Sequence, residues 1–441
     1  MPSMIVLVWP LFTTPSYILN SYYSAQNFEM LSKSSILLLM TLSEELQWRG
    51  FANQTTFQDV HDINTPRTFY LGVDPSASSM HIGNLAQVML VRHLIKNGHK
   101  AIVLVGGATG MIGDPKEDVE RELKTLDEIA TNKAGIAAQY KQLLEAEAFT
   151  LVDNYDWFKN IGYLDFLRDI GKHFSMTQLL DREFIKARIG QGGVGISYAE
   201  FSYSLIQGYD FLHLFREHGA TMQIGGSDQW GNMLSGAQMI RKLEGQEAHV
   251  WTVPLVVDKS TGKKFGKSEG NAVWLNAAMT SPYQFYQFWL NVDDIGVGEL
   301  LKLFTDITPE AHESLMNTFQ EKPSERSAQK HLAYEVTALV HGKDSAEQAR
   351  NVTATLFGDT PVGQLLLEEL DMLAAEIPTT TASTILDALI MSELVSSNGE
   401  ARRLIDGGAI SINGEKVTSS DAPISAPAII KKGKNNFVLA R

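Results

Sequence analysis

Short apolar runs alternate with stretches of helical periodicity along the first half of the chain. The runs read FYLGV at 69–73, AIVLV at 101–105 and TMQI at 221–224, and the segments between them have the spacing of amphipathic helices. Such alternation is typical of βαβ units, whose strands build a mostly parallel sheet. The sequence therefore predicts an α/β fold with a parallel sheet.

A glycine-bearing turn follows each of these runs. The turns read DPSASSMHIGN at 74–84, GGATGMIGDP at 106–115 and GGSDQWGN at 225–232. In open parallel sheets ligands bind at the carboxyl ends of the strands. We therefore expect the three turns to contribute to one binding site.

The first turn leads into a helix. Leu85 and Val88 lie on one face of this helix, so His81, Gly83 and Asn84 fall at or just before its N-terminus. A helix N-terminus offers unpaired N–H groups and the positive end of the helix dipole, which suits a phosphate. On this stretch alone, a turn capped by a polar residue explains the pattern at least as well.

A second informative segment reads DKSTGKKFGKSEGNAVW at 258–274. Its three glycines bracket three lysines, among them Lys264 and Lys267. This pattern predicts a mobile loop that brings ammonium groups onto phosphates. A solvated turn is the alternative interpretation.

Composition narrows the possible chemistry. The chain has no cysteine, which excludes disulfides, zinc ribbons, iron–sulfur clusters and thiol nucleophiles. Its eleven histidines form no HxxxH or HExxH pair, so we expect no metal site built by the protein. The net charge of -14 argues against general nucleic-acid binding, which depends on basic contacts. Residues 381–441 differ, because seven Lys or Arg against six Asp or Glu give a net charge of +1.

The C-terminal part of the chain carries signals of its own. Residues 279–357 look helical, and 358–381 are acidic and then rich in Pro and Thr, which is typical of a linker with a short helix. The sequence of residues 385–417 predicts two short helices, the second of which ends at a Gly-Gly pair, and then a hairpin that turns at Asn413 and Gly414.

HIGN and, some 180 residues later, KFGKS resemble the HIGH and KMSKS signatures of class I aminoacyl-tRNA synthetases. YLGVDPSASSMHIGN, NYDWF, EFSYSLIQGYDF, QIGGSDQWGN and SPYQFYQFW are similar to bacterial-type tyrosyl-tRNA synthetases, and the likeness runs from about Leu46 to the C-terminus. EARRLIDGGAISINGEKV resembles the S4-like RNA-binding domain that ends that family. The sequence departs from the family in two places. Asn84 replaces the second histidine of the first signature. Where many members read GDPSGK, this chain reads GDPKEDVER, so the phosphate-binding role of the family's lysine is not assigned to Lys116.

The resemblance implies a domain order. It comprises a Rossmann-like catalytic domain at 40–278, a helical domain on the anticodon side at 279–357, a linker at 358–381 and a small α+β S4-like RNA-binding domain at 382–441. Residues 1–39 contain one Glu, one Lys and no Arg, which fits neither a secretory signal nor a transit peptide. We expect them to be a non-native or disordered extension.

The implied activity is the ATP-dependent activation of L-tyrosine to tyrosyl-adenylate and transfer of the tyrosyl group to the 3′ end of tRNA(Tyr). Mg²⁺ would arrive with ATP, and the family implies a cytoplasmic homodimer without membrane contact. One alternative is a tryptophanyl-tRNA synthetase, which shares the signatures. The other is a catalytically inert RNA-binding homologue, to which only Asn84 points. Tyr70 with Asp210, both suited to a phenol OH, and the S4-like tail favour tyrosine.

The amino-acid pocket has a rationale in the residues themselves. Tyr203, Gln207 and Asp210 follow each other at i, i+4 and i+7, so one helix presents them on the same side. Burying these polar groups is costly without partners. By resemblance, Asp210 and Tyr70 bind the phenol OH, and Tyr203, Gln207 and Asp114 hold the ammonium group. Gln229 is expected near the reacting carboxylate.

The resemblance also implies a nucleotide site, with Asp228 on the ribose hydroxyls and Gly83 allowing close approach of the adenosine. No nucleophile or base is needed, so the expected catalytic residues stabilise phosphate charge; they are His81, Asn84, Lys264 and Lys267. The whole expected ATP site consists of Gly72, Asp74, Ser76, His81, Gly83, Asn84, Gly226, Asp228, Lys264, Lys267 and Ser268. The expected RNA-binding residues of the tail are Arg402, Arg403, Lys416, Lys431, Lys432 and Lys434.

Overall fold

The computed structural model describes residues 40–115, 123–144, 148–180, 183–190, 193–257, 259–260, 262, 265, 267–268 and 271–441. The chain divides into two units, Met1–Thr41 and Leu42–Arg441. The extension expected at 1–39 lies outside the described residues. In the described part, no helix combines the length and the apolar character that crossing a bilayer requires.

A parallel five-stranded sheet forms the centre of the first half of the second unit. Its order is β3-β2-β1-β4-β5, and every neighbouring pair is parallel. This confirms the predicted α/β fold. The three apolar runs correspond to β1, β2 and β4, whereas the sequence did not predict β3 and β5. The strands are β1 (Thr68–Val73), β2 (Lys100–Val105), β3 (Phe149–Val152), β4 (Ala220–Gly226) and β5 (His249–Val253).

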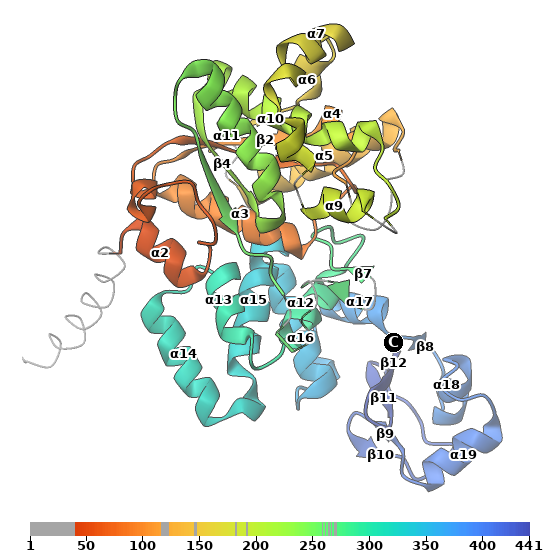
Figure 1. Ribbon diagram of the computed structural model, residues 1–441. Coiled ribbons are helices and arrows are strands. Elements are labelled where there is room, and N and C mark those ends of the chain that lie inside the picture. Colours follow the sequence, from red (N-terminus) through yellow and green to blue (C-terminus); the bar gives the residue numbers. More distant parts are fainter. Residues whose placement is uncertain are drawn as a thin grey trace, which may run out of the picture. The chain divides into compact units, whose positions relative to one another are not determined.

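Helices cover both faces of this sheet (Figure 1). On one face, Phe69 and Leu71 of β1 belong to a core shared with α3 (Ile82–Lys96) and α5 (Leu126–Leu143). On the other face, Tyr70 packs into a core with α10 (Tyr198–His218) and α11 (Trp230–Glu244). Because successive side chains of a strand point to opposite faces of the sheet, Tyr70 lies on the face covered by α10.

Short helices fill the remaining connections of this half. They are α2 (Leu42–Arg49), α4 (Gly107–Gly110), α6 (Tyr155–Phe158), α7 (Tyr163–Asp169), α8 (Met176–Leu180) and α9 (Glu183–Ile189), with 3₁₀ turns at Val60–Asn64, Gly171–His173 and Ser227–Gln229. A two-stranded hairpin of β6 (Lys267–Ser268) and β7 (Asn271–Ala272) follows β5.

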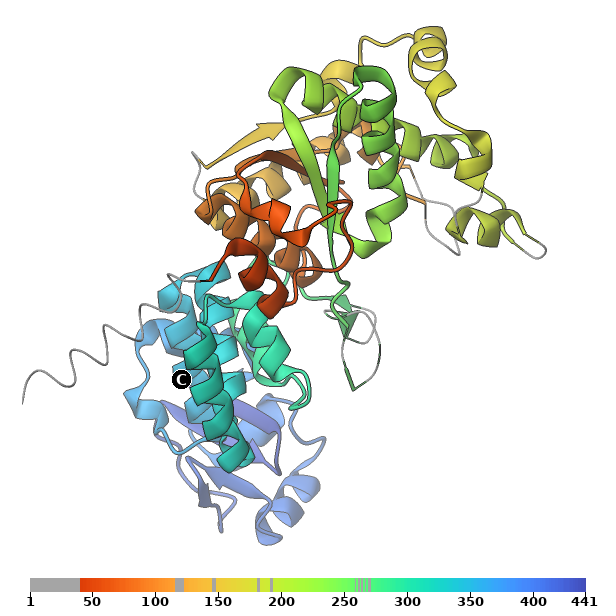
Figure 2. The same ribbon diagram turned by 60° about the vertical axis from the view of Figure 1, so that its left-hand side comes forward.

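A bundle of five helices follows between 282 and 357, in the region whose sequence looks helical (Figure 2). Aromatic and aliphatic side chains such as Phe285, Trp289 and Leu332 fill its interior. The helices are α12 (Pro282–Leu290), α13 (Val297–Phe304), α14 (Pro309–Glu321), α15 (Ser327–His341) and α16 (Lys343–Phe357), with a 3₁₀ turn at Pro323–Glu325.

The last part of the chain forms a small α+β fold with the sheet order β10-β9-β11-β12-β8. The expected hairpin is present, with Asn413 and Gly414 at positive φ between β9 and β10. The elements are α17 (Leu367–Glu376), β8 (Thr379–Thr380), α18 (Ile385–Met391), α19 (Asn398–Asp406), β9 (Ile410–Ile412), β10 (Glu415–Lys416), β11 (Ala428–Lys432) and β12 (Asn436–Ala440), after a 3₁₀ turn at Val362–Gln364.

Strand β8 lies inside the segment whose composition suggests a linker. It pairs with β12 in parallel, Thr379 opposite Leu439. Phe437 and Leu439 of β12 also belong to the core that contains Leu356 of α16 and Leu373 of α17. The C-terminal sheet is therefore packed against the helices that precede it rather than tethered by a free linker.

Candidate functional site

A cavity of about 280 Å³ opens at the carboxyl ends of β1 and β4. Segments from all three predicted glycine turns line it, which places the turns in one site as expected. Its lining residues are Tyr70, Gly72, Val73, Asp74, Ser76, Asn84, Gln87, Leu104, Thr109, Asp114, Tyr203, Gln207, Asp210, Gln223, Ile224, Gly225, Gly226, Asp228, Gln229 and Met233. Twelve of the residues singled out from the sequence are among them: Tyr70, Gly72, Asp74, Ser76, Asn84, Asp114, Tyr203, Gln207, Asp210, Gly226, Asp228 and Gln229.

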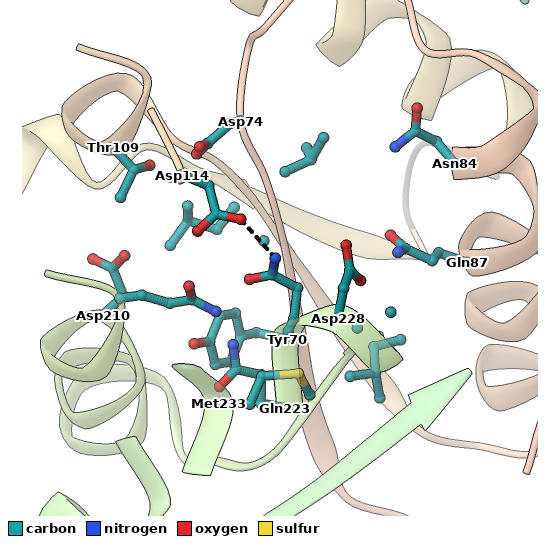
Figure 3. Close-up of a pocket in the computed structure, with 18 of the residues that line it drawn as sticks. Tyr70, Asp74, Asn84, Gln87, Thr109, Asp114, Asp210, Gln223, Asp228 and Met233 are labelled. Carbon is teal, nitrogen blue, oxygen red and sulfur yellow. Dashed lines mark hydrogen bonds between the residues drawn. The ribbon is translucent and has the colours of Figure 1, made fainter. Parts of the chain in front are cut away.

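The cavity has two ends (Figure 3). Tyr70, Asp210 and Gln223 lie together at one end, while Asn84 and Gln87 project from α3 at the other. Asp228 lies between the two groups in this view. We call the first the amino-acid end, after the role that the resemblance implies for Tyr70 and Asp210; the second end lies beside the start of α3.

His81 and Gly83 belong to the helix start rather than to the lining. His81 is the N-cap of α3: its Nδ1 accepts a hydrogen bond from the Gly83 N–H at 3.0 Å, and its own N–H donates to Asn84 Oδ1 at 3.1 Å. A Cβ on Gly83 would lie 2.7 Å from His81 Cε1, so the glycine leaves room for the His81 ring. The helix start predicted from the sequence is confirmed.

The segment after KFGKS lies against HIGN. The Ile82 N–H donates to the carbonyl of Val273 at 3.0 Å, and the Leu275 N–H donates to the carbonyl of Met80 at 2.9 Å. The rings of His81 and Trp274 meet edge to face at 6.1 Å between centroids. The segment that follows the second signature is thus a neighbour of the first signature in space, whereas Lys264 itself and the side chains of Lys267 and Ser268 lie outside the described part.

Asp210 is buried at the amino-acid end, with both carboxylate oxygens hydrogen-bonded. Asn154 Nδ2 donates to Oδ2 at 3.1 Å, and Trp157 Nε1 donates to Oδ1 at 2.9 Å. Burial raises the pKa of Asp210 to about 8, against the lowering effect of these two donors. Burial and the neighbouring Asp210 together raise the pKa of Tyr70 well above its ordinary value.

The raised pKa of Asp210 predicts a pH effect on stability. The native state holds the Asp210 proton from the ordinary pKa of 3.8 up to about 8, whereas the unfolded chain releases it, so stability falls as the pH rises through this window. We expect Asp210→Asn, which cannot titrate, to gain roughly 3 to 5 kcal/mol relative to the unaltered chain between pH 4 and 8, at about 1.4 kcal/mol per unit. Urea unfolding of the unliganded proteins across this range measures the difference, and a constant difference contradicts the prediction.

Three buried polar atoms of the lining have no hydrogen-bond partner among the described residues. They are the Tyr70 hydroxyl, Gln207 Oε1 and Gln223 Oε1. An unsatisfied buried polar atom costs about 1–3 kcal/mol, so such atoms are rare in folded proteins unless a ligand or water pairs with them. Their grouping around one cavity indicates that a polar ligand completes the site.

Two of the residues expected at the ammonium group, Asp114 and Tyr203, are already hydrogen-bonded to other residues of the site. Gln229 Nε2 donates to Asp114 Oδ2 at 2.8 Å, drawn as the dashed line in Figure 3. The Tyr203 hydroxyl donates to Asp74 Oδ2 at 2.8 Å. Asp74, expected from the sequence at the ATP site, thus also contacts a residue expected to hold the amino acid.

Acidic groups dominate the cavity. Asp74, Asp114, Asp210 and Asp228 line it, and none of its described lining residues is a Lys or Arg. An anionic phosphate bound there therefore needs cations from elsewhere, either from the lysines of the 258–274 segment or from a metal ion.

Sequence reasoning missed several residues of this site. Asn154 and Trp157 lie in NYDWF, which the resemblance included as a motif, but nothing local shows that they reach Asp210. Gln87, Thr109 and Gln223 were also missed. Gln87 had a readable signal, because it lies three residues after Asn84 and so shares its side of α3.

The six basic residues expected to bind RNA lie on α19, β10, β11 and the following turn. Arg402, Arg403, Lys416 and Lys434 are exposed. Lys432 Nζ instead donates to the carbonyl of Leu394 at 2.7 Å, and Lys431 Nζ lies 5.1 Å from the centre of the Phe437 ring. The four exposed side chains are the ones most accessible to a phosphate backbone.

Comparisons with known proteins cover nearly the whole chain. The profile of tRNA synthetases class I (W and Y) matches residues 62–358, and that of the tyrosine–tRNA ligase SYY-like C-terminal domain matches 369–440. Tyrosine–tRNA ligase of Streptococcus agalactiae serotype Ia is 43% identical over 418 residues, covering 90% of this chain and 99% of its own. That of Lactococcus lactis subsp. cremoris is 42% identical over 423 residues, covering 91% and 100%. The crystal structure of a C-terminally truncated mitochondrial tyrosyl-tRNA synthetase from Coccidioides posadasii superposes with a TM-score of 0.62 at 29% identity, covering 74% of this chain and 98% of its own.

Proposed function

This chain belongs to the class I tyrosine–tRNA ligases, and from that premise we propose how its cavity performs the family reaction. The enzyme activates L-tyrosine with ATP to tyrosyl-adenylate and transfers the tyrosyl group to the 3′ end of tRNA(Tyr). The observation that carries the assignment of the site is the set of buried, unpaired polar atoms, the Tyr70 hydroxyl above all, next to the Asp210 carboxylate. The alternatives, a tryptophanyl-tRNA synthetase and an inert homologue, are not favoured.

The two groups at the amino-acid end suit a phenol better than an indole. A phenol OH both donates and accepts, so it can donate to Asp210 while accepting from Tyr70. An indole offers a single N–H and no acceptor, so it can pair with only one of the two groups and leaves the other without a partner from the ligand. Phenylalanine would leave both groups unpaired, so this end of the cavity discriminates against both competitors.

In the activation step the tyrosine carboxylate attacks the α-phosphate of ATP and pyrophosphate leaves. No side chain has to act as a nucleophile or a base, so the protein's task is positioning and charge stabilisation. We assign Asp114, Tyr203 and Gln207 to the ammonium group and Gln229 to the carboxylate region. Asp228 is assigned to the ribose hydroxyls.

At the nucleotide end the proposed catalytic residues are His81, Asn84, Lys264 and Lys267, which stabilise the negative charge on the phosphates. The Asn84 amide can donate a hydrogen bond but carries no charge. Mg²⁺ would enter with ATP rather than occupy a site built by the protein, and it would neutralise part of the charge on the phosphates, whose oxygens are ligands that this ion prefers. Among the described residues, no group of three or more ligating side chains forms a separate metal site.

Pyrophosphate exchange tests the assignment directly. We expect exchange that depends on L-tyrosine and fails with L-tryptophan or L-phenylalanine at the same concentration. Exchange driven by tryptophan supports the tryptophanyl alternative, and an absence of exchange in a folded protein that still binds tRNA supports the inert homologue. Either result overturns the proposal.

The C-terminal fold is proposed to bind tRNA. Removing 382–441 is expected to leave adenylate formation nearly intact while transfer to tRNA collapses. Because Phe437 and Leu439 of β12 belong to the same apolar core as Leu356 and Leu373, the truncation removes part of that core, and its folding must be checked by circular dichroism and thermal unfolding. Full-rate charging by a folded truncated enzyme would remove the RNA-binding role from this part of the chain.

A full-length variant avoids that complication. Arg402→Gln, Arg403→Gln and Lys434→Gln together change exposed side chains only. Each lost phosphate contact is expected to lower the slope of log affinity against log salt by about one, so the triple variant loses about three. An unchanged salt slope for tRNA binding would place the contacts elsewhere.

The family also leads us to propose a homodimer that works in the cytoplasm. Apolar or aromatic side chains are exposed around β3, α6, α7 and the start of α10, which supports a contact with a second copy. They are Leu151, Tyr155, Tyr163, Leu164 and Tyr198. Sedimentation equilibrium gives the mass in solution, and the mass of a single chain at working concentration contradicts the dimer.

A further inference from the structure

We propose that Asn232 and Ser204, which do not line the cavity, are positioning residues that aim the Asp114 carboxylate at the ammonium group of the substrate. This inference rests on the proposed role of Asp114. Neither residue stood out in the sequence as a site residue. Asn232 lies in the first turn of α11 and Ser204 on α10, and they are 6% and 2% exposed.

A chain of side-chain hydrogen bonds connects the two residues to Asp114. Ser204 Oγ donates to Asn232 Oδ1 at 2.7 Å. Asn232 Nδ2 donates to Asp114 Oδ1 at 3.3 Å and to Gln229 Oε1 at 3.2 Å. Gln229 Nε2 then donates to Asp114 Oδ2 at 2.8 Å, so each carboxylate oxygen receives one amide N–H.

The direction of every bond in this chain follows from the charge of Asp114. An ionised carboxylate only accepts, so the amide nitrogens of Asn232 and Gln229 must face it. The Asn232 oxygen must then face Ser204, whose hydroxyl is left to donate. The chain therefore turns one amide N–H toward each oxygen of the Asp114 carboxylate.

The backbone around Asp114 explains why such support is needed. Asp114 follows Gly113, which has a positive φ of 79°, and lies outside any helix or strand. Its carboxylate is held by side chains from α11, and through them from α10, which also carries Tyr203 and Gln207. The chain of hydrogen bonds thus connects Asp114 to the helix that carries the other two residues proposed to hold the ammonium group.

The test compares two ligands that differ only in the ammonium group: L-tyrosine and 3-(4-hydroxyphenyl)propionate. Their dissociation constants are measured by isothermal calorimetry for the unaltered enzyme, Asn232→Ala, Ser204→Ala and Asp114→Asn. If the two residues act through Asp114, the preference for tyrosine over the deamino ligand falls about tenfold in Asn232→Ala and about threefold in Ser204→Ala, the range expected for a weakened hydrogen bond to a charged group. Binding of the deamino ligand stays unchanged.

Ser202→Ala is the matched control. Ser202 lies two residues from Ser204 on the same helix, but its hydroxyl donates to the carbonyl of Tyr198 in its own helix, at 2.8 Å. We expect this variant to keep the full preference. In the double variant Asp114→Asn with Asn232→Ala, the preference should fall no further than in Asp114→Asn alone, because both changes act on one contact.

Three outcomes overturn the inference. Equal weakening of both ligands in Asn232→Ala and Ser204→Ala means that the residues only support the fold. An unchanged preference in both variants, with a loss in Asp114→Asn, leaves the role of Asp114 standing and removes the positioning residues. An unchanged preference in Asp114→Asn removes the proposed role of Asp114 and the inference with it.

Discussion

Replacing Asp210 by Ala is expected to lower the kcat/KM for tyrosine by about 10²- to 10³-fold while ATP affinity changes by less than about threefold. The phenol OH of the substrate loses the Asp210 carboxyl group as its hydrogen-bond acceptor. The buried donors of Asn154 and Trp157 lose the same acceptor, which adds the cost of leaving them unpaired. Pyrophosphate exchange at varied tyrosine, with the ATP dissociation constant measured separately, gives both quantities.

Asp156→Ala is a suitable control for this experiment. Asp156 lies in the same NYDWF segment, but its carboxylate is exposed and pairs with Lys159. We expect it to retain normal kinetics for tyrosine. Equal losses for tyrosine and ATP in Asp210→Ala, or an unchanged affinity for tyrosine, would remove Asp210 from the amino-acid end of the cavity.

The second large effect is expected from replacing Lys264 and Lys267 together by Ala. Adenylate formation should slow by about 10²- to 10³-fold for each lysine, whereas ground-state binding of ATP and tyrosine should change little. Negative charge shifts onto pyrophosphate as the reaction proceeds, and contacts made only at that stage affect the chemical rate. The acidic lining strengthens the expectation, since none of its described residues is a Lys or Arg.

Rapid-quench or stopped-flow measurement at saturating substrate gives the rate of the chemical step. Lys259→Ala serves as the control, because Lys259 precedes the same glycine-rich stretch but forms an ion pair with Glu299. A double variant that activates tyrosine at the normal rate, or that shows only a raised ATP dissociation constant, would mean that the segment is a solvated turn.

The sequence predicted those elements whose local pattern is strong. Strands β1, β2 and β4 are buried apolar runs, and α3 has a clear start at His81. Strand β3 was missed because it lies at the edge of the sheet, where Thr150 and Leu151 are exposed and no buried run of residues marks it. Strand β5 reads HVWTV, in which His249 and Thr252 interrupt the apolar residues, so no continuous apolar run marks it in the sequence.

The residues of the site likewise divide into those that a local pattern could predict and those that it could not. Tyr203, Gln207 and Asp210 could be grouped from the sequence because helical spacing is local. Asn154 could not be assigned to Asp210, 56 residues away, because only the packing of the chain brings them together. Most of the other lining residues were predicted from the family resemblance. Such a resemblance implies which distant residues come together in the fold, and periodicity within one segment does not.

The pairing of β8 with β12 has a consequence for synthesis of the protein. Thr379 and Leu439, which face each other in the sheet, are sixty positions apart. At a translation rate of about 5–20 residues per second, β8 is made roughly 3 to 12 seconds before its partner. During that interval the apolar core that contains Leu356 and Leu373 lacks Phe437 and Leu439, which belong to it in the folded protein. We therefore expect this part of the nascent chain to expose apolar surface until β12 has been made, and a longer pause of the ribosome between the two strands extends that exposure.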